Sequence, residues 1–228
     1  MSSIAQSLAE IRNRVTIMER RHGRAPGSVR VVAVSKTKPA SAVREAAEAG
    51  QRDFGENYLQ DAVAKIEALE ALALTWHFIG PIQSNKTRPI AARFAWVHSL
   101  DRARIARRLS EQRPATLPPL EVCIQVNVSG ESSKSGIEPD RLTELAREVG
   151  ELPRLRLRGL MTLPPPCDDF ETQRRPFRKL RELLDELNAS GLDLDTLSMG
   201  MTHDMEAAIA EGATWVRIGT AIFGARET

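Results

Sequence analysis

The chain lacks the features that mark several large classes of protein. Its two cysteines, Cys123 and Cys167, lie far apart and form no CxxC pair, so they provide no disulfide framework and favour a reducing, cytoplasmic location. The N-terminus has no signal-peptide core, and no apolar run is long enough to span a bilayer. A net charge of +2 over 228 residues gives no basis for expecting nucleic acid or an anionic membrane as a partner.

Several catalytic and cofactor motifs are absent as well. No G-x-G-x-x-G follows the first apolar run, which counts against a dinucleotide-binding fold. His77 and His98 lack the H-E-x-x-H spacing of a metal site, and we expect each to be a core or rim residue. There is no G-x-S-x-G turn, and the cysteines carry no nucleophile motif.

The chain does have a regular alternation of strand-like and helix-like segments. An amphipathic helix comes first, with a Ser3-x-x-Gln6 capping box, a stop at Gly23 and apolar residues at helical spacing: Ile4, Leu8, Ile11, Val15 and Met18. Strands are then predicted at 29–35, 53–55, 76–79, 96–99, 120–128, 158–161, 196–199 and 215–218. Helices are predicted at 40–49, 59–72, 102–112, 139–150, 172–189 and 204–211.

This alternation predicts βαβ units around a parallel sheet. About eight repeats fit a single (β/α)8 barrel with an extra N-terminal helix, and we expect one domain over residues 1–228. The alternative is an open, doubly wound α/β sheet, because the strands at 53–55 and 96–99 carry the weakest patterns.

Lys36 stands at the end of the first predicted strand, which is short, apolar and β-branched. Alternation along a strand puts Lys36 on the same face as Val32 and Val34. An amine at the mouth of an apolar face is partly desolvated, and this favours the neutral, nucleophilic form that Schiff-base chemistry requires. The alternative is a lysine that extends its ammonium group into solvent.

Two glycine-containing segments suggest a phosphate site. Gly219 and Thr220 follow the last predicted strand, and Thr202 lies in the turn after the one before it, where barrels often bind phosphate. Glycine lets an anion approach the backbone, and hydroxyl groups add donors. Taken alone, Gly219 is more simply explained as an ordinary turn glycine and Thr202 as a helix N-cap.

Arg217 lies two residues before Gly219 on the same predicted strand, so the two share a face. A guanidinium inside a barrel needs an acceptor or an anion, because it does not shed its charge. A heterocyclic ring nitrogen fits this need, and so does a salt bridge with an interior carboxylate such as Glu56; the sequence leaves both open. Asn57, directly after Glu56, places an amide at another strand end.

Six blocks of the sequence resemble the pyridoxal phosphate homeostasis proteins, and together they span nearly the whole chain: 32–39, 54–58, 77–86, 158–161, 197–201 and 216–224. The resemblance implies a barrel similar to that of alanine racemase, with pyridoxal 5′-phosphate (PLP) as the cofactor. By the same resemblance Lys36 would form a Schiff base with PLP, Arg217 would face the pyridine nitrogen and Asn57 would lie beside the ring. Thr202, Gly219 and Thr220 would hold the phosphate. His203 departs from the pattern, because relatives commonly have an acid there.

The chemistry favours a carrier over an enzyme. PLP stabilises a carbanion best when an acidic partner keeps its ring nitrogen protonated, and an arginine does not readily give up its proton. We see no second acid or base to place opposite Lys36, and no second domain like that of the racemases. We therefore expect a monomeric protein that carries or buffers PLP, with apo PLP-dependent enzymes as candidate recipients. Lys38 and Lys134 either assist exchange at the mouth or are solvated surface lysines.

Three other functions remain open on the sequence. The first is a PLP-dependent enzyme such as an amino-acid racemase, with Lys36 as its base. The second is a Schiff-base aldolase or phosphosugar enzyme on the same barrel, and the third is a protein that acts only through interactions.

Overall fold

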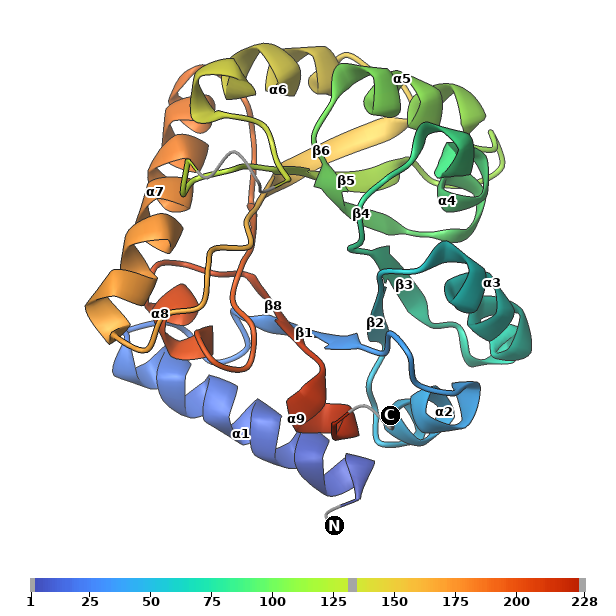
Figure 1. Ribbon diagram of the computed structural model, residues 1–228, viewed down its shortest axis with the longest axis vertical. Coiled ribbons are helices and arrows are strands. Elements are labelled where there is room, and N and C mark those ends of the chain that lie inside the picture. The colour runs from blue at the N-terminus through green and yellow to red at the C-terminus, as the bar shows by residue number, and fades with distance from the viewer. Residues whose placement is uncertain (1–2, 131–134, 226–228) are drawn as a thin grey trace.

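The computed structural model describes residues 3–130 and 135–225 and shows a closed barrel of parallel strands in sequence order, ringed by helices (Figure 1). The barrel closes because β1 pairs with β2 on one side and with β8 on the other, so the open-sheet alternative is wrong. The strands are β1 (Arg30–Val34), β2 (Asp53–Glu56), β3 (Thr75–Phe78), β4 (Trp96–Leu100), β5 (Leu120–Gln125), β6 (Leu155–Met161), β7 (Thr196–Ser198) and β8 (Trp215–Ile218).

The helices cover the outside of the barrel. They are α1 (Ile4–Arg21), α2 (Ala40–Glu48), α3 (Leu59–Ala68), α4 (Thr87–Arg93), α5 (Ala103–Gln112), α6 (Leu142–Gly150), α7 (Phe170–Ala189), α8 (Met205–Ala210) and α9 (Thr220–Phe223). Short 3-10 turns lie at Glu70–Leu72, Ser84–Lys86 and Pro139–Arg141. None of the described helices is long and apolar enough to cross a membrane.

The first helix begins as predicted. The Ser3 hydroxyl accepts the N–H of Gln6, and the Gln6 side chain accepts the N–H of Ser3, which completes the capping box. Figure 1 shows α1 lying alongside α8 and α9 at the edge of the barrel. Near the C-terminal end of α1, the buried Glu19 carboxylate accepts the N–H groups of Gly27 and Val29 and so fixes the chain as it enters β1.

The core has two layers. Inside the barrel a small cluster fills the space between the strands: Val32, Trp96, Cys123, Met161 and Trp215. A larger apolar layer packs between the strands and the helices, which is the arrangement expected when both faces of a parallel sheet are covered. Gly159 on β6 lets β7 approach, because an added Cβ would lie 1.8 Å from the Thr196 carbonyl oxygen.

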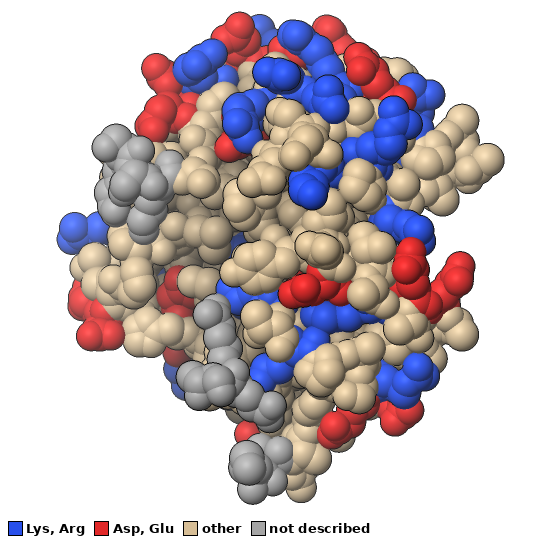
Figure 2. Space-filling view, turned by 45° about the vertical axis from the view of Figure 1, so that its right-hand side comes forward, with Lys and Arg blue, Asp and Glu red and all other residues tan. Residues whose placement is uncertain are grey.

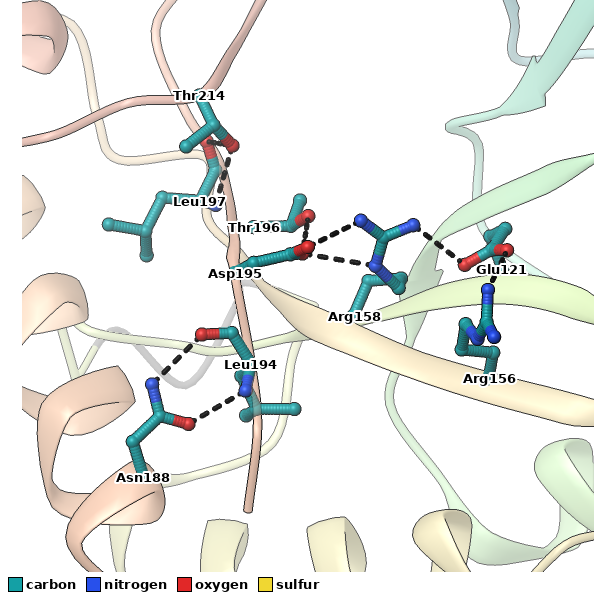
Figure 3. Close-up of polar contacts among 9 residues, drawn as sticks. All are labelled: Glu121, Arg156, Arg158, Asn188, Leu194, Asp195, Thr196, Leu197 and Thr214. Atoms are coloured by element: carbon teal, nitrogen blue, oxygen red, sulfur yellow. Dashed lines mark hydrogen bonds and ion pairs between the residues drawn. The ribbon is translucent and has the colours of Figure 1, made fainter. Parts of the chain in front are cut away.

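Charged groups and two tryptophans close the barrel at the N-terminal ends of its strands. Figure 3 shows the Arg158 guanidinium between the carboxylates of Asp195 and Glu121, and it also lies 5.3 Å from the ring centre of Trp96. On the opposite side Arg30 lies 4.0 Å from the ring centre of Trp215. These contacts form a closed floor, and the other end of the barrel remains for a ligand.

The outer surface carries both signs of charge. On the face drawn in Figure 2, basic and acidic side chains are interspersed over the helices rather than gathered into one field. This distribution agrees with the net charge of +2.

Candidate functional site

Lys36 lies in a tight turn directly after β1, at the C-terminal end of the barrel, and its side chain is partly buried. The N–H of Lys38 donates to the Ser35 carbonyl at 3.0 Å and closes the turn. Thr37 has a φ of 63°, in the left-handed region that a β-branched residue rarely adopts. The strand therefore ends at Val34, one residue earlier than predicted, and a strained turn presents Lys36.

A cavity of about 160 Å³ brings Lys36 together with Gly219 and Thr220. The same cavity is also lined by Val34, Thr37, Lys38, Phe223 and Gly224. Lys38 donates from Nζ to the Ala225 carbonyl at 2.7 Å, so it ties the segment after α9 to the rim. Lys134, the other lysine expected at the mouth, lies outside the described residues.

A buried polar cluster lies behind Lys36, between the barrel and α3. The Ser35 hydroxyl donates to Glu56 Oε1 at 2.6 Å, and Lys65 Nζ donates to the same oxygen at 2.7 Å. Lys65 also donates to the Ser35 carbonyl at 2.7 Å. Burial raises the pKa of Glu56, and the hydrogen bonds from Lys65 and Ser35 oppose that rise. The hydroxyl and the carbonyl group of Ser35 are thus both held in place.

Sequence reasoning missed Lys65, although a signal was present. Lys65 falls on the buried stripe of α3 with Ala62 and, just beyond the helix, Leu69, at the spacing that apolar residues occupy. A lysine on such a stripe needs an internal acceptor, and Glu56 is that acceptor.

Arg217 on β8 is buried in the barrel interior. Its Nη1 donates to Ser198 Oγ at 2.7 Å and its Nη2 to the Thr162 carbonyl at 2.9 Å. The predicted alternative of a salt bridge with Glu56 is wrong, because Glu56 faces outward and pairs with Lys65. Desolvation lowers the pKa of Arg217 to about 10, so the guanidinium remains charged at neutral pH beside uncharged acceptors.

Asn57 follows β2 at the same end of the barrel. Its Oδ1 atom is buried and has no hydrogen-bond partner among the described residues. Asn57 also lines a second hollow of about 340 Å³, together with Phe78, Gln83 and Lys86. A buried acceptor without a partner is costly, and a ligand donor would satisfy it.

Thr202 lies half-buried in the turn between β7 and α8, and this turn is joined to β8 because the Arg217 N–H donates to the Gly200 carbonyl at 2.9 Å. His203, the residue that departs from the family pattern, is exposed, and its Nε2 atom lies 3.1 Å from both Asp168 Oδ1 and the Cys167 carbonyl. A neighbouring carboxylate therefore partly offsets any positive charge at His203.

The six predicted site residues lie on, or shortly after, four adjacent strands. Thr202 follows β7, Arg217 lies on β8 with Gly219 and Thr220 after it, Lys36 follows β1 and Asn57 follows β2. Lys36, Gly219 and Thr220 share one cavity, whereas Asn57, Thr202 and Arg217 are not among the residues that line it. The predicted core placement of both histidines is confirmed, since His77 and His98 are fully buried.

The chain matches proteins of known family over its whole length. The family model described as "Alanine racemase, N-terminal domain" matches residues 6–227. The chain is 63% identical to the pyridoxal phosphate homeostasis protein of Pseudomonas aeruginosa, over 100% of this chain and 97% of that protein. It is 54% identical to the protein of the same name from Escherichia coli K12, over 100% and 98%.

Solved structures agree with this assignment. PipY of Synechococcus elongatus, whose structure is described as having PLP bound, superposes with a TM-score of 0.85 at 38% identity, over 97% of this chain and 100% of PipY. Alanine racemase from Corynebacterium glutamicum superposes with a TM-score of 0.69 at 15% identity, over 99% of this chain and 61% of the racemase, and so shares the fold. The resemblance read from the sequence is confirmed: the chain belongs to the pyridoxal phosphate homeostasis protein family, which is built on the barrel of the alanine racemase N-terminal domain.

Proposed function

We propose that this chain binds PLP reversibly through Lys36 at the C-terminal mouth of its barrel and acts as a carrier or buffer of the cofactor. The observation that carries the proposal is the cavity that Lys36 shares with Gly219 and Thr220. Lys36 supplies an amine, and the two other residues are types that accommodate a phosphate. A relative with 38% identity, PipY, has been solved with PLP bound.

The cavity and the polar residues near it at this end of the barrel fit the cofactor. The buried Oδ1 of Asn57 lacks a partner in the described part of the chain, and a ligand beside it would supply one. At Gly219 an added Cβ would lie 3.3 Å from the Val34 carbonyl oxygen, so a side chain there would crowd the turn that leads to Lys36. Arg217 keeps a positive charge close to the mouth, suited to a ring nitrogen that accepts a hydrogen bond.

In this proposal each residue has one task. The bound cofactor supplies an aldehyde, which condenses with an amine with loss of water and is released by the reverse addition of water. Lys36 provides the amine, and the Ser35–Glu56–Lys65 cluster fixes the backbone before it. Arg217 faces the ring nitrogen and Asn57 lies beside the ring. Thr202, Gly219 and Thr220 hold the phosphate.

A carrier suits these residues better than an enzyme. The Arg217 guanidinium holds its proton at neutral pH, and a ring nitrogen opposite it therefore stays unprotonated and withdraws electrons weakly. The curated relatives carry the name of a homeostasis protein, and apo PLP-dependent enzymes are the recipients we expect. The barrel shared with alanine racemase would support enzyme activity only by analogy of fold.

The test compares the wild type with Lys36→Ala and with Lys38→Ala as the matched control, since both lysines line the cavity. After incubation with PLP, we expect the wild type and Lys38→Ala to be yellow and Lys36→Ala to be colourless. Borohydride reduction followed by peptide mass spectrometry is expected to place the cofactor on Lys36. A wild type that takes up no PLP refutes the proposal. Turnover of an amino acid above the rate of free PLP would make the chain an enzyme instead.

A further inference from the structure

A continuous chain of hydrogen bonds crosses the barrel interior from Arg217 near the mouth to Asp53 at the floor. Arg217 Nη1 lies 2.7 Å from Ser198 Oγ, and Ser198 Oγ lies 2.6 Å from His98 Nδ1. His98 Nε2 lies 2.9 Å from His77 Nδ1, and His77 Nε2 lies 3.1 Å from Asp53 Oδ1. We call Ser198, His98, His77 and Asp53 the histidine relay.

The two ends of the chain set its direction. A guanidinium can only donate hydrogen bonds, and an ionised carboxylate can only accept them. With both imidazoles neutral, all four bonds form in one arrangement: the Ser198 hydroxyl donates to His98 Nδ1, His98 Nε2–H donates to His77, and His77 Nε2–H donates to Asp53. Each histidine therefore carries its proton on Nε2, and the hydroxyl of Ser198 leaves its oxygen to accept from Arg217.

The surroundings keep both imidazoles neutral. Burial lowers the pKa of His98 well below its ordinary value, and the charge of Arg217 lowers it further. Burial also lowers the pKa of His77, Arg30 acts in the same direction, and Asp53 opposes the shift. Arg30 itself lies 3.3 Å from Asp53 Oδ2 and forms an ion pair with the carboxylate at the end of the relay.

Aromatic rings restrict the orientation of the imidazoles. The ring centres of Trp96 and Trp215 lie 5.7 Å and 5.0 Å from that of His77, and Trp96 also packs against His98. Both histidines are fully buried. The rings are thus held in the geometry that the four hydrogen bonds require.

We propose that Ser198, His98, His77 and Asp53 are positioning residues for Arg217, so that a carboxylate at the floor of the barrel sets how the guanidinium is held at the mouth. The link to PLP rests on the proposed function, in which Arg217 faces the cofactor ring. If His98 carried a proton on Nδ1, the Ser198 hydroxyl would no longer donate to His98, and its less polarised oxygen would be a weaker acceptor for Arg217.

The first test uses the protein without cofactor and reads the histidine tautomers from ¹⁵N NMR of the ring nitrogens at neutral pH. We expect His77 and His98 both to be neutral with the proton on Nε2, and His22 and His203 serve as signals from outside the relay. Either relay ring found charged, or with its proton on Nδ1, overturns the inference.

Variants at the floor of the barrel test transmission along the chain. In Asp53→Leu the series of hydrogen bonds loses its terminal acceptor, so we expect a shift toward the Nδ1–H tautomer at His98. His98 contacts His77 and Ser198 rather than Asp53, so this shift would have to pass through His77. Asp53→Glu keeps a carboxylate and should restore the Nε2–H form. Asp195→Leu is the matched control, because Asp195 is also a floor carboxylate but pairs with Arg158 (Figure 3). An unchanged His98 in Asp53→Leu, or an equal change in Asp195→Leu, overturns the inference.

The loaded protein then tests the link to the mouth. We expect the visible absorbance of PLP-loaded Asp53→Leu to differ from that of the wild type in its maximum or in its pH midpoint, while loaded Asp195→Leu matches the wild type. Should Asp53→Leu fail to fold, Ser198→Ala interrupts the chain one bond from Arg217. Identical spectra despite altered tautomers refute the link to Arg217. Failure of the wild type to take up PLP refutes the proposed function and leaves the tautomer result to stand on its own.

Discussion

The buried pair of Lys65 and Glu56 gives a prediction whose size follows from the structure. The side chain of Lys65 is 8% exposed and that of Glu56 is 0% exposed, and they are 2.7 Å apart. Lys65→Met removes the ammonium but keeps an unbranched chain of similar length. Glu56 then keeps one contact, the Ser35 hydroxyl, because its Oε2 atom has no partner in the described residues. Removal of one partner of a buried pair lowers the free energy of unfolding by about 3–5 kcal/mol.

A second substitution separates the charge from the packing. In Glu56→Gln/Lys65→Met no unpaired charge remains, so we expect the double variant to be at least about 2 kcal/mol more stable than Lys65→Met. Lys179→Met, at an exposed lysine on α7, is the control and should change stability by about 0.5 kcal/mol or less.

The pH dependence has a definite sign. The pKa of Glu56 is raised in the folded protein, mainly by burial, and Lys65→Met removes two influences that oppose this rise. A carboxyl group with a raised folded pKa favours folding fully below its unfolded pKa, and this contribution is lost as the pH rises through the folded value. The deficit of Lys65→Met is therefore expected to shrink on acidification.

Urea unfolding followed by tryptophan fluorescence, at neutral pH and near pH 5, measures all of these quantities. A deficit below about 1 kcal/mol at neutral pH would refute the argument that the pair is buried and interdependent. A deficit that grows on acidification would show that the unpaired charge on Glu56 is not its cause.

Three further predictions concern the turn, the site and the histidines. Thr37→Gly relieves a left-handed conformation and should raise the free energy of unfolding by about 1 kcal/mol in urea, and a loss of stability would contradict the turn geometry. Gly80→Ala places a Cβ 2.2 Å from the Asn57 carbonyl oxygen and should cost about 3 kcal/mol and weaken PLP uptake in a spectral titration; unchanged values would show that this contact is absent. The pKa values of the two relay histidines are lowered in the folded protein, so their contribution to stability is complete above about pH 6.5. As the pH falls, the free energy of unfolding should decrease by up to about 1.4 kcal/mol per pH unit for each histidine. Unfolding at stepped pH checks this, and a His98→Gln variant with the same acid sensitivity as the wild type would contradict it.

The sequence predicted the order of elements well because each depends on local patterns. All eight predicted strands are present, including the two with the weakest patterns. The helix at Thr87–Arg93 was missed because it is short, contains Pro89 and buries only three residues, too few to produce a helical period. Strand β6 begins at Leu155, earlier than predicted, since Leu155 and Leu157 are buried alternately with Arg156.

Nonlocal pairing explains what sequence reasoning did not reach. The sequence predicted a barrel from the number of repeats but left an open sheet as an alternative, because closure depends on hydrogen bonds between β8 and β1, which are separated by most of the chain. The partner of Arg217 depends on which residues of the short strands β2 and β7 face the barrel interior. Glu56 on β2 points outward to Lys65, while Ser198 on β7 points inward to Arg217. The relay through His77 and His98 joins strands β2, β3, β4 and β7, and no motif in the sequence connects them.

The two ends of the barrel have different physical roles, and the difference fits reversible binding. At the floor, Trp96 and Trp215 lie beneath the guanidinium groups of Arg158 and Arg30, which are held by ion pairs with Asp195 and Asp53. At the mouth, Lys36 sits in a turn whose first residue is fixed by buried hydrogen bonds and whose third residue is strained. A fixed backbone limits the positions that the Lys36 amine can reach, and a partly open cavity in front of it allows the cofactor to enter and leave from the same side. An enzyme of this fold would need to cover that opening to exclude water, whereas a carrier functions because water can reach the bond that must be hydrolysed for release.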